Sequence, residues 1–309
     1  MARFGCTFIG DLNPDMIIRG NAVPVFGREV FCDEFYLALG GSAAVCAGAF
    51  SNLGQKARFF GRTGDDHLGE YATRELASCG VDVSGVSVRK NSSSPVTVSL
   101  TSSEDRALVT YAGTCGSLDE TDIPVQDILA RTRHIHIGSF FLQQHLAGMF
   151  IRVFERASQR GVTTSLDAGW DPTGEWNRSL FDLLRFTDIF FPNESEALAV
   201  TGEKSPGKAC QRLSEYCRVS VVKLGSKGSI LASGSGPVIE CPIYDKYVGK
   251  DFTGAGDTYN AGFIYAFLEG KSYPDCMRYG SAAAALRISE DRRKRPFPSL
   301  DEVKHVVES

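Results

Sequence analysis

Short apolar segments alternate with helix-like segments along most of this chain, and this alternation limits its possible folds more than any other feature. Six segments have the length and composition of strands: Arg3–Ile9, Ala57–Gly61, His134–Gly138, Thr163–Asp167, Ile189–Pro192 and Val219–Leu224. Helix-like segments are Ala43–Leu53, Tyr71–Ser78, Leu146–Arg160, Arg178–Phe186, Glu194–Thr201 and Lys208–Tyr216. The pattern predicts an α/β protein with a parallel sheet covered by helices. Such sheets bind ligands at the carboxyl ends of their strands.

Two stretches, about 16–39 and 95–112, contain strand-like segments with no helix between them. The strand-like segments are Met16–Ile18, Glu29–Cys32, Val96–Leu100 and Ala107–Tyr111. We expect both stretches to build one small β-sheet that lies over the ligand edge as a lid. The alternative is a pair of hairpins that extends the main sheet at its edge.

Composition argues against several classes of partner. The chain has 33 Lys and Arg against 37 Asp and Glu, a net charge of −4, whereas binding to nucleic acid or an anionic membrane favours a basic surface. Its 309 residues include nine cysteines with no Cys-x-x-Cys pair, a pattern that favours reduced thiols over a disulfide framework. We therefore expect a soluble, cytoplasmic protein without a membrane or nucleic-acid partner.

The most informative segment is the small-residue loop Gly254-Ala255-Gly256, which is followed by Asp257 and a helix-like stretch to Leu268. Small residues at a helix N-terminus let backbone N–H groups converge on an anion, and the helix dipole adds to the attraction. Asp257 suits such a site if it accepts a proton from a hydroxyl that attacks a phosphoryl group. From spacing alone, an Asp that only caps the helix is an equal alternative.

Five motifs follow one another as they do in a known family. They are Gly40-Gly41-Ser42-Ala43-Ala44, Gly61-Arg62-Thr63-Gly64-Asp65-Asp66, Asn193-Glu194-Ser195-Glu196, Lys223-Leu224-Gly225-Ser226-Lys227-Gly228 and Thr253-Gly254-Ala255-Gly256-Asp257-Thr258. In these motifs the chain resembles the ribokinase-like (PfkB-type) carbohydrate kinases. The resemblance implies one domain over residues 1–309, a three-layer α/β/α sandwich with a mostly parallel central sheet and a small β-sheet lid.

The resemblance also implies roles for residues on the phosphate side. Asp257 would be the catalytic base, with the N–H groups of Gly254, Ala255 and Gly256 as the anion hole. Asn193 and Glu196 would organise Mg²⁺ and the phosphates of ATP, with Glu196 acting through water. The nucleotide groove would be lined by Lys223, Gly225, Gly228 and Ser281.

On the acceptor side, the resemblance implies that Asp15 and Asn13 bind sugar hydroxyls, with Gly41, Ser42 and Gln143 as further contacts. Carboxylate and amide groups are suitable partners for a polyol. The family's usual Asn is replaced by Val45, which removes one expected sugar contact.

A second departure concerns a monovalent cation. Asp251 and Thr253 match positions that hold such an ion in many relatives, but the loop that completes the site is replaced here by a basic run at 290–296. We expect weak or absent activation by potassium, with Arg287, Arg292 or Arg293 supplying the positive charge.

Together these features predict a kinase that uses Mg·ATP to phosphorylate a hydroxyl, most simply the primary alcohol of a small sugar. The alternatives are a nucleoside kinase or a keto-deoxy sugar-acid kinase of the same family, or an inactive sugar-binding or regulatory homologue. Open strand edges in the lid also predict a homodimer formed through it.

Overall fold

The large sheet of the computed structural model has nine strands in the order β13-β12-β11-β10-β9-β8-β1-β4-β5. The structure describes residues 3–20, 24–101, 106–176, 178–247, 249, 252–289, 291, 293 and 295–309. The strands are β1 (Phe4–Ile9), β4 (Ala57–Gly64), β5 (Asp82–Arg89), β8 (Thr132–Ile137), β9 (Thr163–Leu166), β10 (Ile189–Phe190), β11 (Val219–Lys223), β12 (Ser229–Ala232) and β13 (Ile239–Cys241). All neighbours from β11 to β5 pair in parallel, and β12 and β13 are antiparallel.

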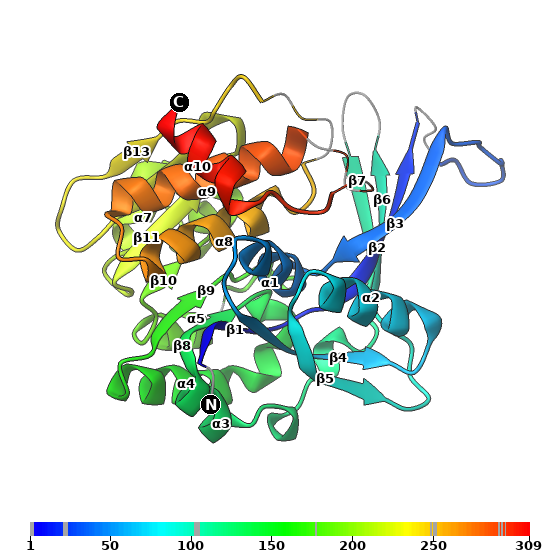
Figure 1. Ribbon diagram of the computed structural model, residues 1–309, viewed down its shortest axis with the longest axis horizontal. Coiled ribbons are helices and arrows are strands. Elements are labelled where there is room, and N and C mark those ends of the chain that lie inside the picture. Colours follow the sequence, from blue (N-terminus) through cyan, green and yellow to red (C-terminus); the bar gives the residue numbers. More distant parts are fainter. Residues whose placement is uncertain are drawn as a thin grey trace.

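Helices cover both faces of this sheet and make a three-layer α/β/α sandwich (Figure 1). One face packs against α1 (Ser42–Asn52), α2 (His67–Ser78), α8 (Ala255–Leu268), α9 (Tyr273–Ser289) and α10 (Leu300–Glu308). The other packs against α3 (Val125–Arg131), α4 (Ala147–Gln159), α5 (Arg178–Leu184), α6 (Glu194–Thr201) and α7 (Pro206–Leu213). The predicted sandwich is therefore confirmed, and the six predicted strands each coincide with a strand to within a few residues at either end.

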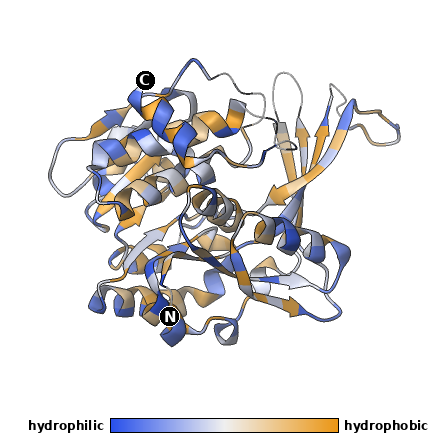
Figure 2. Ribbon diagram, viewed as in Figure 1, coloured by the Kyte–Doolittle hydropathy of each residue, from blue (hydrophilic) through white to orange (hydrophobic). Residues whose placement is uncertain are grey.

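A separate four-stranded sheet, which we call the small sheet, extends from one end of the sandwich (Figure 1). Its order is β3-β2-β6-β7, with β2 (Asn13–Arg19), β3 (Glu34–Gly40), β6 (Val96–Thr101) and β7 (Arg106–Tyr111). The two stretches that lack helices in the sequence therefore meet in one sheet, and they do not extend the large one. Figure 2 shows that its strands are largely hydrophobic.

One predicted strand of this region, Glu29–Cys32, is wrong. The seven residues of β2 pair with Glu34–Gly40, in a register that sets Arg19 opposite Glu34 and Asn13 opposite Gly40. Residues 29–32 lie beyond the last pair and are exposed, because the register that brings Asp15 opposite Ala38 leaves them no partner on β2.

The connection from β3 to α1 brings the sheet ends and the helix together. Gly41 has a φ of 88°, and a side chain there would meet the carbonyl oxygen of Asp11 at 2.5 Å, so only glycine fits. At Gly40 a side chain would lie 2.0 Å from Oδ1 of Asp15. Gly41 thus leaves room for the backbone of Asp11, and Gly40 for the carboxylate of Asp15. Of the helices that the structure describes, none could cross a membrane.

Candidate active site

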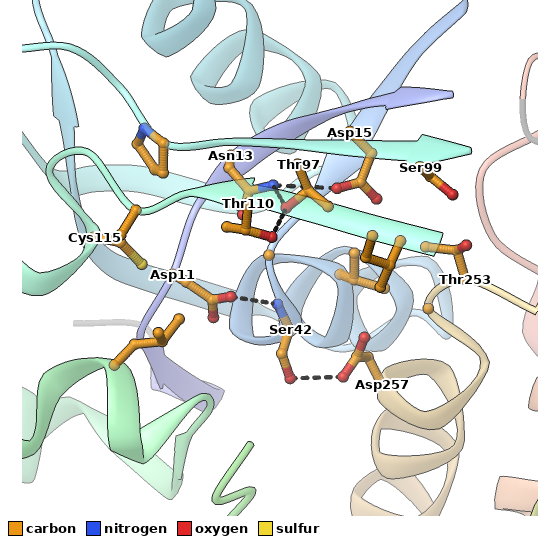
Figure 3. Close-up of a pocket in the computed structure, with 17 residues that line it drawn as sticks. Asp11, Asn13, Asp15, Ser42, Thr97, Ser99, Thr110, Cys115, Thr253 and Asp257 are labelled. Carbon is orange, nitrogen blue, oxygen red and sulfur yellow. Dashed lines mark hydrogen bonds between the residues drawn. The ribbon is translucent and has the colours of Figure 1, made fainter. Parts of the chain in front are cut away.

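A cavity of about 210 Å³ lies between the small sheet and the carboxyl end of β1 (Figure 3). Its polar lining consists of Asp11, Asn13, Asp15, Ser42, Thr97, Ser99, Thr110, Cys115, Thr253 and Asp257, and the rest of Gly41, Val45, Pro95, Leu108, Ala112, Leu142 and Gly254. We call Asp11, Ser42, Gly254 and Asp257 the floor, and Asp15, Thr97, Ser99, Leu108 and Thr110 the roof. The cavity therefore forms where the two sheets meet, at the ligand edge that the sequence predicts.

The floor is centred on Asp257, in the first turn of α8. Ser42, the first residue of α1, donates a hydrogen bond of 2.6 Å from Oγ to Oδ1 of Asp257. Gly254 caps α8 with a φ of 76° and no side-chain cap bond, which leaves the first N–H groups of the helix without a side-chain acceptor. Gly254 and Asp257 line the cavity, whereas Ala255 and Gly256 of the predicted anion hole do not. Ala255 differs from the prediction, because its N–H donates to the carbonyl oxygen of Phe252 at 3.2 Å in a turn.

Asp257 has the protonation behaviour of a base that works near neutral pH. Burial, and then the negative charge of Asp167, raise the pKa of Asp257 to about 7, against the opposing effects of Lys223 and of the Ser42 hydrogen bond. A carboxylate with a pKa in this range can take a proton from an alcohol more readily than an exposed Asp can. The equal alternative of a simple helix cap is weakened, since no side-chain cap bond is made at this helix.

Asp11 is a floor residue that the sequence predictions missed. It accepts hydrogen bonds from the backbone N–H groups of Ser42 and Ala43, at 2.9 and 3.0 Å, and so caps α1. Burial raises its pKa. Its position directly after the first strand was the available signal, but Asn13 and Asp15, which lie in the next strand, matched the family pattern better.

The roof carries the predicted acceptor residue Asp15 and several unpredicted hydroxyls, and the predicted Asn13 lies beside it. Asn13 Nδ2 donates to Asp15 Oδ1 at 3.1 Å and approaches Thr97 Oγ1 at 3.5 Å. Thr97 Oγ1 is 3.0 Å from Thr110 Oγ1 on the neighbouring strand. Thr97 and Ser99 share one face of β6 because strand side chains alternate, and this period-two pattern was the signal that could have identified them.

Gln143 does not line the cavity but lies beside Leu142, which does. Its side chain is 0% exposed, and neither amide atom has a hydrogen-bond partner among the described residues. A buried unpaired amide is costly, at roughly 1–3 kcal/mol for each unsatisfied group. The residue therefore has hydrogen-bonding capacity that a ligand or water could use.

A second polar cluster follows β10 and β11, outside the lining of the cavity. Asn193 caps α6, with reciprocal bonds of 2.9 Å between its Oδ1 and the Glu196 N–H and between Glu196 Oε2 and its own N–H. Burial, and then the charge of Asp167, raise the pKa of Glu196 to about 7. Lys223 forms a β-bridge with Asn193 and directs its ammonium to Asp167 at 2.8 Å.

Three further residues predicted for the nucleotide groove lie near these strand ends. Gly225 has a φ of 60°, and Gly228 has a φ of 89° and packs so closely that a side chain would meet the Cys241 carbonyl oxygen at 2.1 Å. Ser281 Oγ, on α9, donates to the carbonyl oxygen of Pro242 at 3.1 Å. The turn 225–228 and α9 are therefore joined through the segment around residue 241.

The residues predicted to bind a monovalent cation, or to replace its charge, do not all lie at the cavity. Thr253 lines the cavity, whereas Asp251 and Arg292 lie outside the described residues. Arg287 is buried, 3% exposed, and a side-chain carbon on Gly254 would lie 3.6 Å from its Nη2. Arg293 instead lies over the Tyr36 ring of the small sheet at 5.2 Å.

Comparisons with known proteins agree on one family. The profile described as pfkB family carbohydrate kinase matches residues 6–299. A ribokinase from Arabidopsis thaliana is 29% identical over 97% of this chain and 79% of its own length. A 2-dehydro-3-deoxygluconokinase from Bacillus subtilis (strain 168) is 29% identical over 89% of each chain.

Solved structures extend the likeness to the whole fold. The structure of A. thaliana ribokinase with ribose and ATP has a TM-score of 0.85 at 25% identity and covers all of both chains. An E. coli protein solved with ATP and Mg²⁺ has a TM-score of 0.84 at 21% identity and covers 99% of each chain. ATP and Mg²⁺ thus occur in structures of this fold. At 21% identity, the similarity to the E. coli protein concerns the fold alone.

Proposed function

Because this chain belongs to the pfkB family of carbohydrate kinases, and is therefore a phosphotransferase with an alcohol acceptor, we propose that it transfers the γ-phosphoryl group of Mg·ATP to the primary hydroxyl of a small neutral sugar. The observation that carries this proposal is Asp257, which lines the cavity at the N-terminus of α8 and is bonded to Ser42. A base and a helix N-terminus on one side of a cavity are the parts that such a transfer needs.

In this reaction Asp257 accepts the proton of the attacking hydroxyl, and Ser42 fixes the orientation of its carboxylate through the 2.6 Å bond. The N–H groups of the Gly254–Gly256 turn hold the phosphoryl group as it is transferred, with those of Gly254 and Gly256 more available than that of Ala255. The small sheet acts as a lid that excludes water, which would otherwise compete with the sugar as a nucleophile.

On the nucleotide side, Asn193 and Glu196 organise Mg²⁺ and the phosphates of ATP. The nucleotide groove is lined by Lys223, Gly225, Gly228 and Ser281. Within the described part of the chain, no three Asp, Glu, His or Cys residues are grouped to hold a metal ion. This fits Mg²⁺, which keeps several waters and relies on substrate phosphates. When bound, Mg²⁺ would offset the charge of the phosphates, and Glu196 would help to hold it through water with the carboxylate oxygen that its capping bond does not use.

On the acceptor side, Asp15 and Asn13 bind sugar hydroxyls, and Gly41 and Ser42 complete the contacts, whereas Gln143, buried outside the cavity lining, does not reach the sugar. Three carboxylates line the cavity, those of Asp11, Asp15 and Asp257, so a carboxylated substrate would be repelled. The volume of about 210 Å³ is below the ~300–1,000 Å³ of pockets for drug-sized ligands and suits a monosaccharide. A neutral sugar is therefore favoured over a sugar acid or a nucleoside.

The test is a coupled assay of ADP release with a panel of neutral pentoses and hexoses, their aldonic and keto-deoxy acids, and nucleosides. We expect kcat/KM for the best neutral sugar to exceed that for any acid or nucleoside by at least tenfold. A preference for an acid or a nucleoside would overturn the acceptor assignment and leave the kinase assignment. No ADP release with any acceptor, in protein that binds ATP, would favour an inactive sugar-binding homologue.

The outer face of the small sheet supports a homodimer formed through the lid. Phe35, Val109 and Tyr111 are exposed on it, which is unusual for large apolar side chains placed together. Val109→Asp should shift the sedimentation coefficient from dimer to monomer, and a monomeric unsubstituted protein would contradict the proposal.

All nine cysteines are free thiols, which fits the predicted cytoplasmic location.

A further inference from the structure

A closed triangle of polar groups lies behind the first turn of α8. Lys223, the last residue of β11, donates from Nζ to Asp167 Oδ2 at 2.8 Å and to Asn260 Oδ1 at 3.3 Å. Asn260 Nδ2 completes the triangle with a bond of 2.8 Å to the same Asp167 oxygen. Asp167 follows β9 and Asn260 belongs to α8, so three separate elements are tied together at this point.

The triangle is directly coupled to the catalytic turn. Asn260 lies three residues after Asp257, which places both side chains towards the same side of α8. A side-chain carbon on Gly256 would lie 3.5 Å from Lys223 Nζ, so the ammonium packs against the turn that carries the proposed anion hole. Neither Lys223 nor Asp167 lines the acceptor cavity.

We propose that Lys223 is a positioning residue for the phosphoryl transfer: with Asp167 and Asn260 it holds the first turn of α8 in place, and its charge keeps Asp257 ionised. The inference rests on the proposed role of Asp257 as the base. It gives Lys223 a task beyond the nucleotide groove that the sequence resemblance implies.

The charges around Asp257 explain why the lysine matters. Among the described residues, the ionisable groups that act on it are Asp11 after β1, Cys46 of α1, Asp167 after β9 and Lys223 of β11, and Arg287 of α9 lies at the neighbouring Gly254. Burial would lower the pKa of Lys223, but Asp167, Glu196 and Asp257 raise it above its ordinary value, so the lysine stays charged. Burial would likewise raise the pKa of Asp167, yet Lys223 keeps it below its usual range.

Removing only the lysine therefore leaves the Asp167 charge acting on Asp257 without its counter-charge. The pKa of Asp257 then rises, and the acid limb of the rate profile, where the base loses its function by protonation, moves to higher pH. Removing both charges also takes away the largest neighbouring repulsion on Asp257, so the limb should move back. If the role of Lys223 were purely structural, the acid limb would not move up in the single variant and back down in the double variant.

The experiment measures the pH dependence of kcat/KM for the best acceptor in the unsubstituted protein, Lys223→Met, Lys223→Arg and the double variant Lys223→Met/Asp167→Asn. We expect Lys223→Met to shift the acid limb upward by about one pH unit and to lower kcat at pH 7 by about fivefold or more, because the ionised fraction of a base with a pKa of about 7 falls by that factor. The double variant removes both members of the Lys223–Asp167 pair, so it should fold better than Lys223→Met, which leaves the Asp167 charge buried alone. In it the limb returns to the unsubstituted position or below. Lys223→Arg keeps the charge and should keep the limb in place.

Two results would overturn the inference. One is an unmoved acid limb in Lys223→Met with a large rise in KM for ATP, which would make Lys223 a nucleotide ligand only. The other is a double variant shifted as far upward as the single one. Asp257→Asn separates these from failure of the proposed function, because retention of turnover in that variant would remove the base itself, whatever Lys223 does.

Discussion

The floor and the roof of the cavity are built by different means. Floor residues sit at helix N-termini, where Asp11 caps α1 and Ser42 is bonded to Asp257, with buried helices behind them. Roof residues lie on a four-stranded sheet whose other face carries exposed apolar side chains, and Leu108 is 51% exposed although it lines the cavity. From this difference we expect a division of roles: the floor residues carry out the phosphoryl transfer, and the roof residues determine which acceptor binds.

The sharpest test of this division is the loss of the base. Asp257→Ala should lower kcat by about 10²–10⁴-fold, the range for a general base, with KM for the acceptor changed less than threefold. Asp257→Asn should fall as far, because its amide can keep a bond to Ser42 but cannot accept the proton. Single-turnover rates and ATP affinity measured by calorimetry check both points. Turnover within tenfold of the unsubstituted protein would contradict the assignment of the floor to chemistry.

The second test concerns the backbone of the floor. Gly254→Ala places a side chain at a φ of 76° and 3.1 Å from Val45 Cγ1, so the first turn of α8 must shift. We expect kcat to fall about 10²-fold, as when one donor of a preformed anion hole is lost.

Gly161→Ala is the matched control for this substitution. Its φ is 67°, nothing lies within 4 Å of the added carbon, and it is remote from the cavity. Both variants should lose similar stability, about 1–2 kcal/mol, in a denaturant titration. Equal losses of activity in the two variants would mean that the effect of Gly254→Ala is global rather than local.

How far the sequence predicts this architecture depends on whether a feature is contiguous in the chain. The Gly254–Asp257 segment is a contiguous motif, and its first and last residues line one cavity together with the predicted Asp15 and Ser42. Periodicity alone also predicts the layers, because buried parallel strands are uninterrupted apolar runs.

Features that depend on pairing between distant segments could not be predicted. Thr97 and Thr110 are ordinary strand residues until β6 and β7 pair in register and turn them to the cavity. The Lys223–Asp167 ion pair spans 56 residues and has no sequence signal of its own. Glu29–Cys32 has strand-like composition but lies outside the register of β2, which is why its prediction is wrong.

The roof can be tested with a smaller expected effect. Thr97→Val removes a hydroxyl that lines the cavity and should raise KM for the acceptor by about 2–12-fold, the equivalent of one hydrogen bond of 0.5–1.5 kcal/mol, with kcat within twofold. Thr101→Val is the control on the same strand and face: it lies outside the cavity lining and removes only a contact of 3.3 Å between its hydroxyl and that of Ser99. Steady-state kinetics with varied acceptor measures both. A fall in kcat with unchanged KM in Thr97→Val would break the proposed division between roof and floor.

The smallest expected effect is that of potassium. Arg287 places a buried guanidinium against Gly254 and lies over the Phe297 ring at 5.8 Å, so a fixed positive charge already stands beside the floor. Replacing Na⁺ with K⁺ at constant ionic strength should therefore change kcat/KM by less than twofold. Arg287→Met should be slower, and K⁺ should restore part of its activity, whereas Arg293→Gln, which alters a contact on Tyr36 instead, should remain insensitive to K⁺. A several-fold activation of the unsubstituted protein by K⁺ would show that the floor still lacks a charge that Arg287 does not supply.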